Sequence, residues 1–276
     1  MNELTLVINP GSTSTKLALY RGDKPVNVDS VDHSGEEWAT RRETVSQLPH
    51  RVAIALDYLQ KHGFKPEDLA CIVARGGLLR PVRSGAYEVN RTMREDLSSE
   101  VGGRHASNLG GLIAWRLSQD GRIPCYIVDP VSVDEYAPEA RVSGMPEIQR
   151  KSLLHALSIR ATAGRAAADL GRALEDLYLV VAHLGSGFSI CPCYKGKLRD
   201  ANNSNEEGPF TVERAGTLPA LFLLDLISSK DSSAVRAALV TESGMYGYTG
   251  TKDARKVEAG AKAGGAETRV WEAMAY

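Results

Sequence analysis

Short apolar runs and apolar-polar alternation recur along the chain, bounded by Gly, Pro, Asn and Asp, and this pattern predicts β-strands. The predicted strands cover residues 4–8, 17–20, 26–31, 70–74, 86–89, 123–128, 178–183, 187–191 and 197–200. Between many of them apolar residues recur at helical spacing, which predicts helices over residues 43–62, 106–119, 149–171, 219–228, 232–240, 252–262 and 266–276. The mixture predicts an α/β protein that opens with an antiparallel meander.

The stretch VINPGSTSTKLALY, residues 7–20, places small polar residues and a Lys after an apolar run. A Walker loop needs G-x-x-x-x-G-K-[ST] between a strand and a helix. Here Thr15 precedes Lys16, and the apolar run that follows is too short for a helix. We therefore predict a hairpin with a polar turn at residues 10–15. Its hydroxyl groups and backbone N–H groups could face an anion, although the same residue types are ordinary in turns.

The stretch VVAHLGSGFSI predicts a second hairpin, in which Gly185 and Gly187 bracket Ser186. Absence of a Cβ lets a backbone approach an anion closely, but a Gly-rich turn also needs no ligand. Each hairpin opens one half of the chain, and the Pro/Gly/Ser-rich segment 138–149 resembles a domain junction. We predict domains at residues 1–149 and 150–276, whose two turns would aim at one ligand across a cleft.

Several charged side chains stand where ligands commonly bind, each with an ordinary alternative. Asp129 ends an apolar strand, where α/β sheets gather ligand groups. Arg75 lies in an Arg-rich and Gly-rich loop that suits an anionic substrate, although loop arginines are often only solvated. Arg214 lies between two prolines, where it could instead pair with Glu213. His155 lies in an apolar helical stretch, where a core histidine is the usual interpretation.

Composition excludes several classes of protein. The 276 residues include 33 Lys and Arg against 34 Asp and Glu, for a formal charge of -1, so we expect no nucleic-acid partner. The N-terminus lacks the pattern of a secretory signal, and no apolar run is long enough to span a membrane, so we expect a cytoplasmic protein. The four cysteines suit reduced thiols; Cys191 and Cys193 would share one strand face, a weak alternative for metal binding.

Long blocks of the sequence, in order, resemble the butyrate kinase family. The blocks are VINPGSTSTKLALY, RGGLLRPVRSGAYEVN, HASNLGGLIA, VDPVSVDEYAPEARVSGMPEIQRKSLLHAL, AHLGSG, DANN, GPFTVERAGTLP and EAMAY, and they cover essentially the whole chain. That family is grouped with the acetate kinases in the superfamily of actin, sugar kinases and heat-shock chaperones. The resemblance implies two ribonuclease-H-like (actin-like ATPase) domains around a nucleotide cleft.

The resemblance also implies roles for individual residues. The nucleotide phosphates would be bound by Asn9, Ser12, Ser14, Lys16, His183, Gly185 and Gly187. Asn9 and Asp129 would contribute to a Mg²⁺ site, which needs few protein ligands. The catalytic residues would be Arg75 and Arg214, which position the acyl carboxylate and neutralise the transferring phosphoryl group, together with His155 and Asp129.

The reaction implied is reversible phosphoryl transfer between ATP and a short-chain carboxylate of the butyrate or 2-methylpropanoate type, giving an acyl phosphate and ADP. The nucleophile is already a carboxylate, so no general base is needed. Acetate or propionate kinase is one alternative, and an inactive or regulatory remnant that keeps the fold is another. The resemblance further implies a homodimer or higher homo-oligomer.

Two features depart from the family pattern. Ser186 stands where butyrate kinases usually carry Gly, which would strain the turn if its φ is positive. The sequence RVWEAMAY ends inside a predicted helix, whereas the family continues well beyond this point. We therefore expect a C-terminally truncated chain with an incomplete second domain and weak or absent kinase activity.

Overall fold

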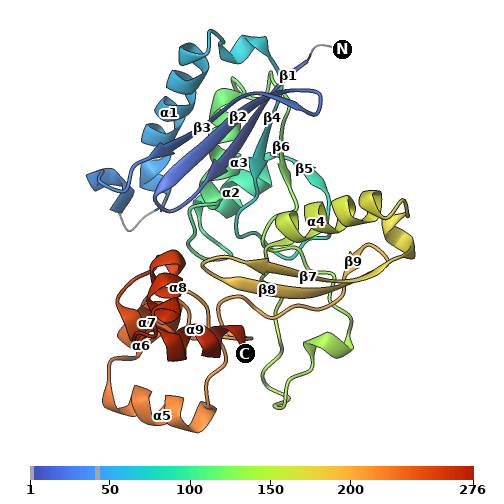
Figure 1. The fold of residues 1–276 in the computed structure, drawn as a ribbon. Coiled ribbons are helices and arrows are strands. Elements are labelled where there is room, and N and C mark those ends of the chain that lie inside the picture. Colours follow the sequence, from blue (N-terminus) through green and yellow to red (C-terminus); the bar gives the residue numbers. More distant parts are fainter. Residues whose placement is uncertain (1–2, 41–43) are drawn as a thin grey trace. The chain divides into compact units, whose positions relative to one another are not determined.

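The structure is a computed structural model that describes residues 3–40 and 44–276. Contacts within the chain divide it into two compact units, Met1–Asp134 and Glu135–Tyr276 (Figure 1). Each unit mixes helices and strands, so the predicted α/β class is confirmed.

The division between the units lies earlier than the boundary predicted at residues 149 and 150, for a local reason. The Tyr136 hydroxyl donates to the Ala201 carbonyl at 2.5 Å, and the Arg150 guanidinium donates to the Ala140 carbonyl at 2.8 Å. These hydrogen bonds fasten the Pro/Gly/Ser-rich segment to the second unit. That each unit is a ribonuclease-H-like domain stays a prediction.

The first unit is built on a six-stranded mixed sheet in the order β3-β2-β1-β4-β6-β5. β1, β2 and β3 form the predicted antiparallel meander, β4 and β6 run parallel to β1, and β5 closes the edge antiparallel to β6. The strands are β1 (Leu4–Pro10), β2 (Ser14–Arg21), β3 (Lys24–Asp32), β4 (Leu69–Arg75), β5 (Ala86–Glu88) and β6 (Cys125–Val128).

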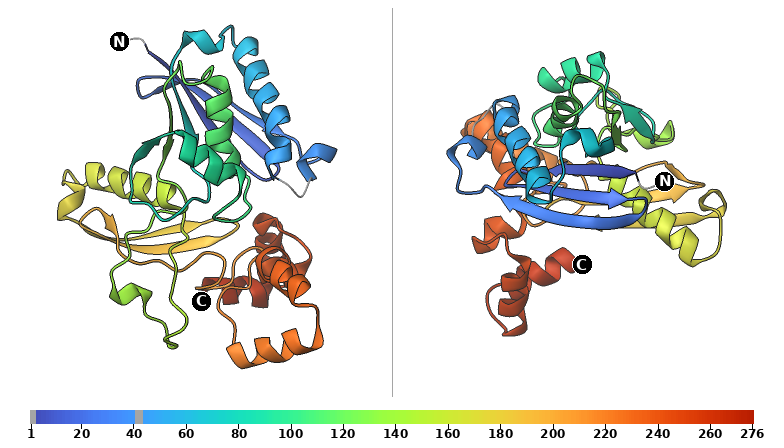
Figure 2. Two further views of the ribbon diagram at one scale, coloured as in Figure 1. Left: turned by 180° about the vertical axis from the view of Figure 1, so that it is seen from behind. Right: turned by 90° about the horizontal axis from the view of Figure 1, so that it is seen from above.

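Two helices of the first unit, α1 (Leu48–Lys61) and α3 (Asn108–Leu117), lie on one side of this sheet (Figure 2). α3 contacts β1, β4 and β6, α1 contacts β2, and α2 (Arg91–Ser98) packs on α3. Residues of β1, β4 and β6 that point toward these helices are buried. The fully buried members of this core include Leu6, Ile8, Leu19, Ile72, Ile113 and Ile127.

The second unit contains a three-stranded antiparallel sheet and six helices among its described residues. The strands are β7 (Tyr178–Leu184), β8 (Phe188–Tyr194) and β9 (Lys197–Leu198), in that order. α4 (Ala156–Asp169) packs against β7. The remaining helices are α5 (Ala220–Ser229), α6 (Ser232–Thr241), α7 (Gly244–Thr249), α8 (Ala254–Lys262) and α9 (Thr268–Ala275).

The predicted helices are correct in place but not always in extent. The helix predicted over 149–171 begins only at Ala156, so His155 stands at its N-cap position instead of inside it. Residue 43, where another predicted helix begins, lies outside the described residues. Within the described ranges, each helix is too short or too polar to cross a bilayer.

Candidate functional site

The first turn, residues 10–15, joins β1 to β2 as predicted. The register pairs Asn9 with Lys16 directly across the two strands, so these side chains share one face, and both are exposed. The Gly11 N–H donates to the Ser14 carbonyl at 2.8 Å and closes the turn. Ser12 is exposed and Ser14 partly so. All four predicted phosphate ligands of this unit therefore lie at one hairpin end.

The predicted residues Asn9, Arg75 and Asp129 follow one another across neighbouring parallel strands. Ile8 pairs with Ala74, which sets Asn9 beside Arg75, and Arg75 pairs with Val128, the residue before Asp129. Parallel α/β sheets bind ligands at the carboxyl ends of their strands. The register thus brings two of the predicted catalytic residues and the first turn to one edge of the sheet.

The loop after Arg75 packs so closely against its neighbours that its two glycines have no room for a Cβ. A Cβ on Gly76 would lie 2.5 Å from Cβ of Pro130, and a Cβ on Gly77 would lie 2.6 Å from Cα of Asn108. Burial lowers the pKa of the Arg75 guanidinium, which nevertheless stays charged near neutral pH. Its side chain makes no hydrogen bond or ion pair with another described residue, so its donors are available to bind an anion.

Asp129 is held in an uncommon backbone conformation. Its φ is 38°, in the left-handed region that non-glycine residues rarely adopt. Its N–H donates to the Gly85 carbonyl at 3.0 Å, and its carboxylate Oδ1 accepts from the Gly85 N–H at 2.7 Å. Strain of this kind persists only where surrounding contacts enforce it, and it concentrates at functional sites.

The residues predicted to hold Mg²⁺ fit that ion by donor type. Asn9 and Asp129 supply an amide oxygen and a carboxylate at the carboxyl ends of β1 and β6. Mg²⁺ prefers oxygen ligands and commonly takes only one or two from the protein, with phosphate and water completing the set. Among the described residues, His, Cys, Asp and Glu nowhere form a group of three that could hold a metal ion.

The second turn, Gly185-Ser186-Gly187, joins β7 to β8 as predicted, with Leu184 paired to Phe188. The φ of Ser186 lies outside the left-handed region, so the serine that departs from the family pattern fits the turn without backbone strain. The Gly185 N–H points toward the Gly187 carbonyl at 3.4 Å.

Arg214 lies over the second turn. Nη1 donates to the Ser204 carbonyl at 2.7 Å and to the Ser204 hydroxyl at 3.0 Å, while Nε is buried without a partner among the described residues. A Cβ on Gly187 would lie only 2.4 Å from Nη1, so glycine is needed here to seat the guanidinium. Thr211 links the two segments, because its hydroxyl donates to the Ser186 carbonyl and accepts from the Arg214 N–H.

Two histidines complete this cluster in the second unit. The rings of His155 and His183 stack with centroids 4.0 Å apart and planes 14° from parallel. His155 Nδ1 is 2.9 Å from the Ser189 hydroxyl, which also accepts the His155 N–H at 3.3 Å, so Ser189 fixes this ring at the start of α4. The structure therefore brings together His155, His183 and the second turn, on which Arg214 rests.

The cysteine pair of β8 is buried. Cys191 and Cys193 are 0% and 2% exposed. Burial raises the pKa of the Cys191 thiol to about 12 and also raises that of Cys193. A metal binds the thiolate, which burial disfavours, so these side chains act as small core residues.

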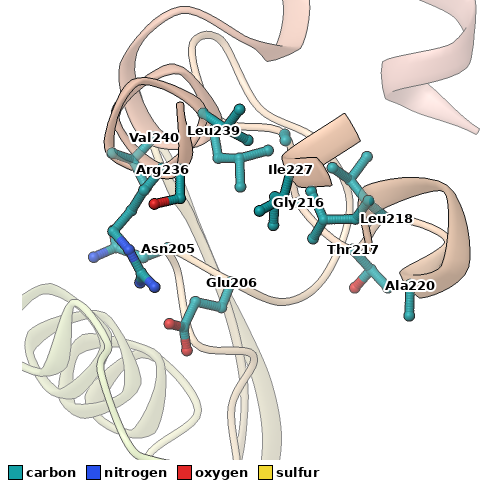
Figure 3. A pocket seen from close by; sticks show the side chains of 14 residues that line it. Asn205, Glu206, Gly216, Thr217, Leu218, Ala220, Ile227, Arg236, Leu239 and Val240 are labelled. Carbon is teal, nitrogen blue, oxygen red and sulfur yellow. The ribbon is translucent and has the colours of Figure 1, made fainter. Parts of the chain in front are cut away.

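A cavity of about 510 Å³ lies elsewhere in the second unit, between α5 and α6 (Figure 3). Its walls are mainly aliphatic, and Asn205, Glu206 and Arg236 lie at one side. None of the predicted site residues lines it.

Sequence reasoning missed the residues that support this site from behind. Ser189 follows Gly187 by two positions on β8, so strand alternation could have placed it beside the turn. Ser204 and Thr211 come from loops without a periodic pattern, and no sequence signal points to them. Arg51 holds the first turn and falls on the buried side of α1 with Ala55, Tyr58 and Leu59, a spacing that could have revealed it.

Comparison with known proteins shows to which family this chain belongs. Residues 136–276 match the model of the acetokinase family. A probable butyrate kinase of Thermotoga petrophila is 42% identical over 273 residues, covering 98% of this chain and 76% of the relative. A probable butyrate kinase of Caldanaerobacter subterraneus is also 42% identical, over 98% of this chain and 77% of the relative.

Solved structures show the same fold at lower identity. Acetate kinase of Porphyromonas gingivalis superposes with a TM-score of 0.74 at 19% identity, covering 99% of this chain and 76% of that one. A propionate kinase of Francisella tularensis gives a TM-score of 0.74 at 18% identity, covering 99% of this chain and 77% of that one. The resemblance inferred from the sequence blocks is confirmed: the chain belongs to the acetokinase family.

Proposed function

We propose that this chain transfers the γ-phosphoryl group of ATP to a short-chain carboxylate of the butyrate or 2-methylpropanoate type. A carboxylate oxygen attacks the γ-phosphorus, the bond to the β-phosphate oxygen breaks, and an acyl phosphate and ADP are formed; the reverse reaction makes ATP. The observation that carries the proposal is the seat of Arg214 on Gly187, which sets a guanidinium with a buried, unsatisfied Nε over a glycine turn. The names of the relatives, probable butyrate kinases, support the acceptor class.

The residues divide into groups that bind phosphate and groups that neutralise charge. Asn9, Ser12, Ser14 and Lys16 bind phosphate at the first turn, and His183, Gly185 and Gly187 do so at the second. Arg75 positions the acyl carboxylate, while Arg214 and His155 donate to the oxygens of the transferring group. Fixed donors stabilise the charge that spreads over those oxygens, so catalysis depends on alignment and electrostatics and needs no base.

Mg²⁺ is part of this proposal. Asn9 and Asp129 would hold it, and when bound it would neutralise charge on the phosphate oxygens. The cytoplasm is the proposed location, since ATP is available there and the four free cysteines would stay reduced.

Acyl hydroxamate formation tests the proposal. The 276-residue chain is incubated with ATP, MgCl₂, hydroxylamine and one acid from the series acetate, propionate, butyrate and 2-methylpropanoate. Consistent with the weak activity expected from the sequence, we expect hydroxamate to form slowly, with kcat/KM highest for a four-carbon acid and falling about tenfold or more for each methylene removed, since a pocket discriminates by ~1–3 kcal/mol per methylene. A maximum at acetate or propionate would reassign the acceptor, and nucleotide binding without hydroxamate from any acid would favour the nonenzymatic alternative.

We also infer that the chain is a homodimer formed through α5. This helix has no buried residue, and its apolar side chains Leu221 and Phe222 are 77% and 74% exposed. Its inner side borders the 510 Å³ cavity, so α5 is incompletely packed on both sides (Figure 3). Asp225 is its one charged residue. A nearly uncharged apolar helix suits its own copy across a two-fold axis.

Light scattering after size exclusion tests this interface. We expect a dimer for the unaltered chain and a monomer for Phe222→Asp, because the substitution would bury two carboxylates at a two-fold contact. Tyr248→Asp is the matched control: Tyr248 is similarly exposed, at 77%, but belongs to α7. A monomeric unaltered chain, or a dimer that persists in Phe222→Asp, would contradict the interface.

A further inference from the structure

The first turn is held from its covered side by a buried side chain, Arg51 of α1. Arg51 is 0% exposed. Nη1 donates to the Ser14 carbonyl at 3.2 Å and to the Thr15 hydroxyl at 2.9 Å, and Nη2 reaches the Ser12 carbonyl at 3.4 Å. One guanidinium therefore binds three successive parts of the turn, and its rigid planar fork fixes their relative positions.

A second residue fixes Arg51 itself. The side-chain oxygen of Gln47 accepts from Nη2 at 2.9 Å and from Nε at 3.2 Å. Gln47 is buried, and its amide nitrogen donates to the Ala39 carbonyl at 3.2 Å. The donors of Arg51 are thus directed at the turn by a bidentate contact one helical turn earlier in the chain.

Arg51 lies on the opposite side of the hairpin from the proposed phosphate ligands. Thr15, whose hydroxyl binds Arg51, is 0% exposed and faces α1. Its strand neighbour Lys16 is exposed and pairs with the exposed Asn9. Successive side chains of a strand point to opposite faces, so a ligand bound by Asn9 and Lys16 would not touch Arg51.

The positive charge of Arg51, like its hydrogen bonds, favours anion binding at the first turn. In the part of the chain that the structure describes, Arg51 is hydrogen-bonded to carbonyl, hydroxyl and amide oxygens and to no carboxylate. Its guanidinium carbon lies 5.7 Å from the ring centroid of Trp38. A positive charge that no nearby carboxylate neutralises, in a medium of low polarity, favours an anion on the far side of the turn.

We propose that Arg51 is a positioning residue for the first turn: it fixes the shape in which the turn accepts nucleotide phosphate and adds positive potential from behind. The inference rests on the proposed function of that turn. It predicts an effect on nucleotide binding that is separable from the acyl acceptor, because the hydrogen bonds that Arg51 makes to described residues go to this turn and to Gln47.

Calorimetric titration with MgADP and steady-state kinetics test this role in Arg51→Met, Arg51→Lys and Thr15→Val. We expect MgADP affinity and the KM for ATP to worsen about 10- to 100-fold in Arg51→Met, the range typical of residues that orient a binding group from behind. The KM for butyrate should stay unchanged. Arg51→Lys should recover part of the loss through its charge, and Thr15→Val should show a smaller loss in the same parameter. Arg91→Met, at an exposed ion pair on α2, is the control.

Thermal unfolding of each variant separates positioning from general stability. If Arg51→Met does not fold, Thr15→Val, which removes one acceptor and keeps nearly the same shape, decides the matter. Unchanged nucleotide affinity in folded Arg51→Met or in Thr15→Val, or equal increases in the KM values of ATP and butyrate, would overturn the inference. Failure of the unaltered chain to bind MgADP would instead overturn the proposed function of the turn on which the inference rests.

Discussion

Replacement of Arg214 by alanine is expected to lower kcat for acyl phosphate formation by about 10³- to 10⁵-fold, the effect of removing an arginine that neutralises a transferring phosphoryl group. Nη1 is hydrogen-bonded to Ser204. This contact holds the guanidinium in place without occupying all of its donors. The buried Nε has no partner among the described residues and would gain one when phosphate oxygens arrive. The measurement is the hydroxamate rate at saturating ATP and butyrate.

The control and the conservative variant make this expectation specific. Arg165→Ala removes an exposed arginine of α4 in the same unit and should leave kcat unchanged. Arg214→Lys keeps a positive charge but loses the planar fork that rests on Gly187, so it should recover only a small part of the rate. If Arg214→Ala kept its rate within tenfold of the unaltered chain, Arg214 would not be the group that stabilises the transition state.

Local sequence pattern predicted most of the fold. Each predicted strand overlaps a strand of the structure, because short apolar runs bounded by turn residues carry a strong signal. Two helices were missed. α2 has only two apolar residues, Met93 and Leu97, on its polar surface, and α7 contains glycine at two of its six positions. The packing of α2 on α3 stabilises this helix, and that contact cannot be read from the sequence of α2 alone.

The site was predicted unevenly, because hairpin geometry is local and loop packing is not. Asn9 and Lys16 follow from strand register around a short turn. The seat of Arg214 on Gly187 joins residues separated by loops with no periodic pattern, so the sequence pointed to each residue separately but not to their contact. Arg51 was overlooked because a buried arginine violates the usual polar-out pattern of an amphipathic helix, and such violations often mark functional sites.

Gly187→Ala is expected to disable the enzyme by displacing Arg214 while leaving the fold intact. The three atoms nearest to a Cβ at this position all belong to the Arg214 side chain, the closest being Nη1 at 2.4 Å. The φ of Gly187 lies outside the left-handed region, so alanine meets no backbone strain there. The flexible guanidinium must therefore move, and we expect it to lose its hydrogen bonds to Ser204. A displacement of about 1 Å can cost ~100-fold in rate, so we expect kcat to fall by about that factor or more with little change in melting temperature.

A double-variant cycle measures whether the two residues act as one unit. If Gly187 serves mainly to seat Arg214, Gly187→Ala should cost little further rate once Arg214 is already alanine, because the group it displaces is gone. Gly164→Ala, at an exposed position of α4 where a Cβ meets no atom within 4 Å, is the matched control and should keep full activity. Multiplicative losses in the double variant would instead mean that Gly187 contributes through its own contact with phosphate, as the glycine of an anion-binding turn, and that its fit to Arg214 is secondary.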